Sequence, residues 1–359
     1  MDLLIRKTKF WLTPLILLSL IILLHLFSMQ HAWVEKIYSA YIYPPVAGLL
    51  RIITNFIPFS LGDVLYACVF IWILVAVIRF FRKGPTWLKF FVSLRNLIVK
   101  CLWVYVFFLL LWGLNYYRYG IGYKMQLYPD VYSTADLKAV TTQLREELNV
   151  SRKLMDSLHL GYTDDTATLR NAAELYNNAK AKYPFLSYPH ADVKKMLFAT
   201  IGNYSGYLGY YNPFTGEAQV NTKAPVFVVP FTACHEIGHQ LGFASESEAS
   251  FAAYLVVNAG NSVVFKYSAY FDLFAFANGE LSVRDSVASK QNKALLDTLV
   301  KKDYAAYRQY LNAYDNPVEP LLAALYGSYL KAHNQPKGID SYDEVVAWIV
   351  AYYKKYGKL

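Results

Sequence analysis

Two histidines and a glutamate stand in the order His-Glu-x-x-His at residues 235–239. On an α-helix, residues four apart share one face, so His235 and His239 can bind the same metal ion. Glu236 then lies beside the ion, where its carboxylate can take a proton from water that the metal activates. The spacing therefore predicts a zinc-dependent hydrolytic site with Glu236 as general base. The alternative is a core helix that carries two buried histidines.

Zinc held by a protein needs a third ligand, and the residues after the motif offer several. Ser245 stands where peptidases with the longer motif HExxHxxGxxH place a histidine or aspartate, and a serine is a poor substitute for imidazole. Two glutamates follow at the start of a helical run over 246–257. Ser245 and Glu248 fit a capping box, which gives Glu248 a structural role. We therefore predict Glu246 as the third ligand and Glu248 as the alternative, with Glu280 and Glu319 as more distant candidates.

The elements around the motif are predicted from local patterns. The β-branched run at 224–231 indicates a strand that leads into the motif helix, with Thr232 as N-cap and Gly242 as the stop. The segment 206–221 is typical of a hairpin that turns at 212–216. Ser133 is the expected N-cap of an amphipathic helix, and further helical patterns lie near 165–182, 189–201, 287–313, 317–332 and 341–355. These elements together predict a mostly helical α+β domain with a small sheet.

The first third of the chain is too apolar for a soluble domain. Three stretches reach the length of about 20 residues that a bilayer requires, at 10–29, 64–81 and 97–117. The apolar stretch 41–59 contains three prolines and Arg51, which favours an interfacial or re-entrant helix over a fourth span. We therefore predict a membrane domain at 1–120 with three transmembrane helices, followed by a globular domain at 121–359.

The charge distribution indicates which side of the membrane each part occupies. Residues 1–120 hold 12 Lys and Arg against three Asp and Glu and so carry the whole net charge of +9. Six of these cations, and no acidic residue, lie between 79 and 100. Positive loops stay in the cytoplasm, so the N-terminus is expected inside and the globular domain outside. A basic charge confined to membrane flanks argues against a nucleic-acid partner, and the expected partners are the bilayer and a peptide or protein substrate.

Two resemblances add to these predictions. HEIGH followed by Glu246-Ser-Glu-Ala249 resembles the gluzincin metallopeptidases, whose third zinc ligand is a Glu in an ExxA-type helix. That branch commonly places Asp or Asn four residues after this Glu, where Ser250 stands here, to support a ligand. More widely, the strings "IPFSLGD", "GYYNPFTGEAQVN", "PFTACHEIGHQLGFASESEA" and "GIDSYDEVVAWI" resemble an uncharacterised bacterial family of three-pass membrane proteins, a family of unknown function.

The gluzincin resemblance implies a zincin-like fold, a Zn²⁺ cofactor and peptide binding along a sheet edge. The implied edge strand is Glu217, Ala218, Gln219, Val220 and Asn221. The oxyanion-stabilising group stays open among Tyr326, Tyr329, His333 and Tyr342. The sequence thus predicts a zinc metallopeptidase held at the outer face of the bacterial cytoplasmic membrane. The alternatives are a zincin-like scaffold with little turnover and a hydrolase of a non-peptide envelope amide.

Overall fold

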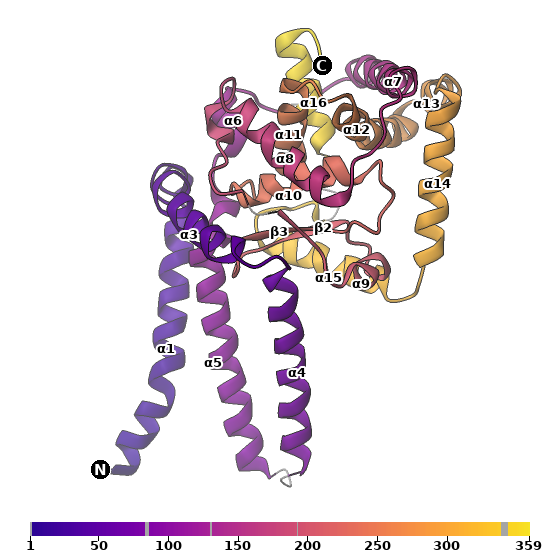
Figure 1. Ribbon diagram of the computed structural model, residues 1–359. Coiled ribbons are helices and arrows are strands. Elements are labelled where there is room, and N and C mark those ends of the chain that lie inside the picture. Colours follow the sequence, from indigo (N-terminus) through magenta and orange to yellow (C-terminus); the bar gives the residue numbers. More distant parts are fainter. Residues whose placement is uncertain (1, 83–85, 130, 192, 339–343) are drawn as a thin grey trace.

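The protein is described by a computed structural model, which covers residues 2–82, 86–129, 131–191, 193–338 and 344–359. Three long helices project from one side of a globular part that holds most of the remaining chain (Figure 1). They are α1 (Asp2–Ser28), α4 (Leu61–Arg82) and α5 (Trp87–Leu111). Each is long and apolar enough to cross a membrane, and they are the three such helices among the described residues. The prediction of three apolar helices of membrane-spanning length is therefore confirmed.

The third span differs from its prediction in position. α5 begins ten residues before the expected start at 97 and ends at Leu111 rather than 117. Trp112, with φ −161°, leaves the helical conformation, and a 3₁₀ helix η2 (Gly113–Tyr117) follows. The short helix α6 (Gly120–Met125) then leads into the globular part.

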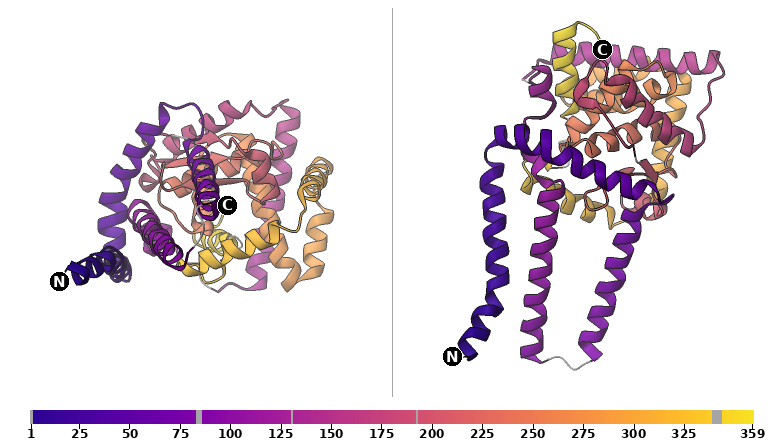
Figure 2. Two further views of the ribbon diagram at one scale, coloured as in Figure 1. Left: turned by 90° about the horizontal axis from the view of Figure 1, so that it is seen from below. Right: turned by 60° about the vertical axis from the view of Figure 1, so that its left-hand side comes forward.

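The segment between α1 and α4 lies across the ends of the three long helices (Figure 2). It contains α2 (His31–Trp33), the π-helix η1 (Val34–Ile42) and α3 (Tyr43–Asn55). As predicted, this segment does not add a fourth span. Arg51 of α3 is buried and donates to the backbone carbonyls of Pro189, His190 and Gln240, so α3 is docked on the globular part.

Helices make up most of the globular part, as predicted. They are α7 (Thr134–Ser157), α8 (Asp165–Ala179), η3 (Pro184–Leu186), α9 (Ala199–Tyr204), α10 (Val229–Gln240), α11 (Glu246–Ala259), α12 (Val263–Arg284), α13 (Ser286–Ala294), α14 (Thr298–Tyr314), α15 (Glu319–Ala332) and α16 (Val345–Tyr356). Ser133 caps α7 in a capping box with Asp136, which confirms that prediction. The sequence patterns missed α12, which is apolar on most of its surface and therefore has no clear amphipathic period.

The sheet has three strands in the order β1-β3-β2. They are β1 (Val193–Lys195), β2 (Gly209–Asn212) and β3 (Glu217–Val220). The hairpin of β2 and β3 is confirmed, with Asn212 accepting the backbone N–H groups of Phe214 and Thr215 in the turn. The helix expected over 189–201 is wrong, since this segment forms β1 and only the start of α9.

That difference also corrects the predicted edge strand. β1 pairs in parallel with one side of β3, and β2 pairs antiparallel with the other. Residues 217–221 are fully buried, and β3 is the central strand. The edge assignment for Glu217 to Asn221 was therefore wrong, because the partner that covers β3 comes from a segment with a helical pattern.

Two apolar clusters hold the fold together. The larger one is the core of the globular part, built mainly on α7, α8, α10, α11, α12 and α16. The second joins residues on both sides of the predicted domain boundary at 120, among them Tyr38, Tyr43, Trp112, Tyr211 and Ala244. The membrane-proximal segments and the globular part therefore share one packed junction.

Candidate metal centre

The motif helix α10 begins earlier than the sequence indicates. Residues 224–228 form turns rather than a strand, and the helix starts at Val229 with Pro230 in its first turn. Pro230 suits this place because its missing N–H would have had no partner there. Thr232 is inside the helix and donates to the Val228 carbonyl, so its assignment as N-cap was wrong.

The end of α10 is a Schellman turn built on Gly242. Phe243 N donates to the Gly238 carbonyl (3.1 Å) and Gly242 N to the His239 carbonyl (2.9 Å). Gly242 has φ +81°, a conformation that favours glycine, which confirms its predicted role as the stop. The chain therefore reverses within a few residues and starts α11 at Glu246.

α10 and α11 pack closely because of a glycine inside the motif. A Cβ at Gly238 would lie 3.0 Å from the Ala249 carbonyl oxygen and 3.1 Å from its Cα. A side chain at Gly238, or a larger one at Ala249, would push the two helices apart. This close approach brings the first turn of α11 beside the two histidines of α10.

The structure brings His235, His239 and Glu246 together. Each offers one ligand atom, and these three atoms lie within 4.8 Å of one another. The Nε2 atoms of both histidines are 3.2 Å from the same oxygen, Oε2 of Glu246. All three side chains are buried, at 8%, 6% and 2% exposure.

The other nitrogen of each imidazole has its own partner. Nδ1 of His235 lies 3.0 Å from the Ser250 hydroxyl, and Nδ1 of His239 lies 2.8 Å from the Phe243 carbonyl oxygen. A carbonyl oxygen can only accept, so His239 carries a proton on Nδ1, which leaves Nε2 as the nitrogen that faces Glu246 and that a metal ion would bind. Partners of this kind fix the tautomer and ring orientation of metal-binding histidines. Ser250 thus occupies the supporting position that the sequence assigned to it.

Glu246 is held from two further elements. Its Oε1 accepts from the Tyr326 hydroxyl of α15, and its backbone N donates to Gln335 (3.3 Å). Burial would raise the pKa of this carboxyl, but the two imidazoles outweigh burial and lower the pKa well below the ordinary value. Glu246 is therefore an anion that is fixed in place.

The structure does not bring the other candidate acids to the histidines. Oε1 of Glu248 accepts from the backbone N of Ile121 (2.7 Å), near Arg118 on the far side of α11. The capping box of Ser245 with Glu248 was wrong, since no side chain caps α11 and the Ser245 hydroxyl contacts that of Ser247. Glu280 pairs with Arg284, away from the motif. Glu319 lies against Gly206.

Glu236 differs from the other acids of the site in its environment. It is 4% exposed, and its Oε2 has no hydrogen-bond partner among the described residues. Burial, with a smaller contribution from the Glu246 carboxylate, raises its pKa to about 8 although His239 acts in the other direction. A buried carboxylate oxygen without a partner is costly, and such groups are typical of functional sites.

A cavity of about 600 Å³ adjoins the site, and it is lined by His235, Glu236, His239 and Glu246. Its other walls come from α9, β2, α15 and the ends of α4 and α5, with many aromatic side chains: Tyr66, Phe108, Trp112, Tyr116, Phe198, Tyr207, Tyr210, Tyr211, Phe214, Tyr326 and Tyr329. Of the four oxyanion candidates, Tyr326 and Tyr329 line this cavity, whereas His333 packs beside Phe108 and Tyr329. Tyr342 is outside the described residues. No sequence pattern pointed to α4 and α5 as walls, because that contact is non-local.

Comparison with known proteins gives the family. The model of the family described as "Protein of unknown function (DUF3810)" matches residues 38–350. The chain belongs to this family. The DUF3810 match spans α3, α4, α5 and nearly all of the globular part, so the resemblance seen in the sequence is confirmed at the level of an uncharacterised family. No match was found among curated proteins or among solved structures.

Proposed function

We propose that the protein is a zinc-dependent peptidase, anchored by three transmembrane helices and carrying its zincin-like domain on the outer side of the cytoplasmic membrane. The observation that carries this proposal is the convergence of His235, His239 and Glu246, with Glu236 beside them in the same cavity. The cation-rich flanks at 79–100 support the orientation.

The donor set fits zinc. Two imidazole nitrogens and one carboxylate oxygen are a common ligand set of catalytic zinc, which leaves one coordination position open. Both imidazoles are oriented through Nδ1, and Glu246 is already an anion, so the three side chains are in place and zinc has only to displace a proton from the histidines. When bound, Zn²⁺ would supply Lewis-acid activation of water and of the substrate carbonyl.

The protein's own groups supply the remaining chemistry. Glu236, through its unpartnered Oε2, is the group to accept a proton from the attacking water and deliver it to the leaving amine; the positive charge of bound Zn²⁺ would lower its pKa from about 8 and so favour the carboxylate form that accepts. Tyr326 and Tyr329 line the same cavity and present hydroxyl groups. Tyr329 is the better oxyanion donor of the two, because the Tyr326 hydroxyl already donates to Glu246.

The corrected sheet order favours β2, an outer strand, as the one to bind an extended substrate. Gly209 of β2 lies against the general base, since a Cβ there would be 2.6 Å from Oε1 of Glu236. Asn221 N donates to the Leu208 carbonyl, so in the antiparallel register the backbone groups of Gly209 and Tyr211 point away from β3. An extended peptide can add to this free edge and present its backbone beside Glu236.

Two matched variants in one helix test the metal site. Glu246→Gln and Glu248→Gln each replace one carboxylate with an amide of the same shape, two residues apart. We expect the purified full chain to hold about one zinc per molecule in wild type and in Glu248→Gln, and to lose it in Glu246→Gln. Inductively coupled plasma mass spectrometry gives the metal content. No zinc in folded wild-type protein would remove the proposal.

A third variant, Glu236→Gln, distinguishes an active enzyme from a scaffold that has little turnover. Glu236→Gln leaves the three ligands intact, so it keeps zinc and loses hydrolysis. Intact Glu236 at the cavity wall favours an active enzyme over a silent scaffold. A Glu236→Gln variant that is indistinguishable from wild type in cells would instead favour the scaffold.

A further inference from the structure

The cavity that contains the candidate metal centre has a wall made by membrane helices. Asp63 and Tyr66 come from the first turns of α4, and Phe108, Trp112 and Tyr116 come from the end of α5 and the segment after it. Both helices meet the requirements for a membrane span. The cavity therefore borders the place where the space between α4 and α5 leaves the bilayer.

α4 stands apart from the other two spans. Its most apolar stretch has no residue buried within the protein, whereas α1 and α5 pack on each other. Figures 1 and 2 show α4 separated from α5 along its length. A second cavity, of about 480 Å³, lies between them toward their other ends, and the described residues that line it fall within 72–81 of α4 and 90–100 of α5. Lys100 and Trp72 both line this second cavity, and the Lys100 ammonium lies 4.1 Å from the centre of the Trp72 ring.

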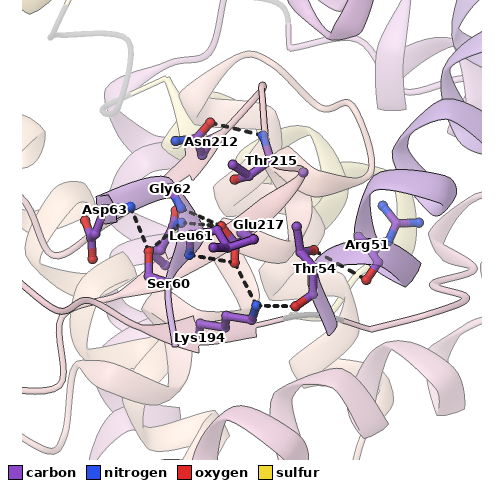
Figure 3. Close-up of polar contacts among 12 residues, drawn as sticks. Arg51, Thr54, Ser60, Leu61, Gly62, Asp63, Lys194, Asn212, Thr215 and Glu217 are labelled. Carbon is purple, nitrogen blue, oxygen red and sulfur yellow. Dashed lines mark hydrogen bonds and ion pairs between the residues drawn. The ribbon is translucent and has the colours of Figure 1, made fainter. Parts of the chain in front are cut away.

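Polar contacts with the sheet, rather than packing in the membrane, fix α4 (Figure 3). Glu217 of β3 accepts the backbone N–H groups of Leu61 and Gly62 at 3.1 and 2.7 Å, at the N-terminus of α4. Lys194 of β1 donates to the same carboxylate at 2.7 Å.

A second acid binds α4 to the strand beside the site. Asp63 accepts from the hydroxyl of Tyr210 in β2 and from the backbone N of Leu197, each at 2.6 Å. The sheet that borders the general base thus also sets the position of α4. These contacts fix the first turn of α4 on the sheet.

We propose that the space between α4 and α5 admits the transmembrane segment of a polypeptide substrate, whose adjoining extended chain is then cleaved at the metal centre. This inference rests on the proposed peptidase function. The walls of the second cavity, between α4 and α5, are mostly apolar, so its occupant is apolar. A polypeptide fits better than a lipid chain because Ser93 and Asn96 line the cavity with groups that can hydrogen-bond a neighbouring transmembrane helix. It also agrees with the peptide-binding role proposed above for the outer edge of β2.

The test uses the full chain in lipid nanodiscs and a defined probe. The probe is a leucine-alanine span of about 20 residues, followed on the side of the globular part by a short segment of mixed sequence. The same segment without the span is the second probe. Ala76→Trp fills the cavity between α4 and α5, and Ile78→Trp, on α4 but outside the lining, is the matched control. Unchanged zinc content in each variant establishes that it is folded.

We expect the wild type and Ile78→Trp to cleave the span-bearing probe about tenfold faster than the free segment, because the span concentrates the chain at the site. Ala76→Trp should lose this advantage and keep its rate on the free segment. Equal rates on both probes, unaffected by Ala76→Trp, would overturn the inference and indicate entry from water.

A photoreactive residue at 76 or 78 in the same nanodiscs distinguishes failure of this inference from failure of the peptidase proposal. A cross-link from 76, but not 78, to the probe's span supports the docking site even if neither probe is cleaved, in which case only the peptidase proposal falls. A cross-link from 76 to phospholipid alone would overturn the docking site.

Discussion

Replacing Ser250 with alanine removes the hydroxyl that lies 3.0 Å from Nδ1 of His235. If zinc were bound through Nε2, His235 would carry its proton on Nδ1 and donate a hydrogen bond from it to the Ser250 hydroxyl oxygen. Ser250 is 3% exposed, so water has little access to replace the hydroxyl. Without zinc, the other tautomer can donate from Nε2 to Glu246, 3.2 Å away. Loss of the Ser250 hydroxyl therefore destabilises the zinc-bound state more than the zinc-free state.

The expected change in zinc affinity follows from this difference between the zinc-bound and zinc-free states. A buried donor without an acceptor costs about 1–3 kcal/mol. Partners of this kind typically change metal affinity by about 10–100-fold, which agrees with that range at about 1.4 kcal/mol per factor of ten. We therefore expect Ser250→Ala to raise the Kd for zinc by about 10–100-fold.

Competition between the purified full chain and a fluorescent zinc chelator measures this Kd. Ser247→Ala is the matched control, because Ser247 is a buried serine of the same helix whose hydroxyl contacts Ser245 instead of a histidine. It should bind zinc as the wild type does. A wild-type Kd in Ser250→Ala would refute the assignment of Ser250 as the group that orients His235.

Two further predictions concern stability. Glu35 is 1% exposed and binds Arg118 and Lys124; burial alone would raise its pKa, but these cations outweigh burial and lower the pKa below 4.5. Glu35 thus stabilises the fold above pH 4.5 and loses this effect as pH falls through its lowered pKa. Glu35→Gln should lower the thermal midpoint at pH 7, with a difference from wild type that shrinks below pH 4.5; a difference independent of pH would contradict the ion-pair account. Gly242→Ala, at φ +81° and with Tyr43 and Asn115 about 3 Å from the new Cβ, should destabilise by at least about 1–2 kcal/mol in chemical unfolding. Gly279→Ala, in α12 with open space around it, should stabilise by about 0.5–1 kcal/mol, and equal effects of the two substitutions would count against the strain argument.

Local physics explains which parts of the site the sequence could predict. The i, i+4 spacing of His235 and His239 and the turn at Gly242 depend only on neighbouring residues, and the structure bears out both. Apolar length likewise predicted the three spans. These features need no knowledge of distant contacts.

Tertiary structure decided the rest. Glu246 and Glu248 both fit the motif in sequence, but two residues correspond to about 200° around a helix, so only one can face α10. The close contact of Gly238 with Ala249 fixes which face of α11 packs on α10, and Glu246 is the glutamate on that side. The pairing of β1 with β3 joins residues that are 25 apart in the chain, and it leaves β2 as the outer strand beside the site.

The sequence by itself therefore determined the spacing that puts the two histidines on one helix face, the number of candidate spans and the family resemblance. Only the tertiary structure decided the third acid at the site, the strand that faces the cavity and the place of α4 and α5 in its wall. The reason is that helix periodicity and hydropathy are properties of short segments, whereas these other features depend on how segments far apart in the chain pack together.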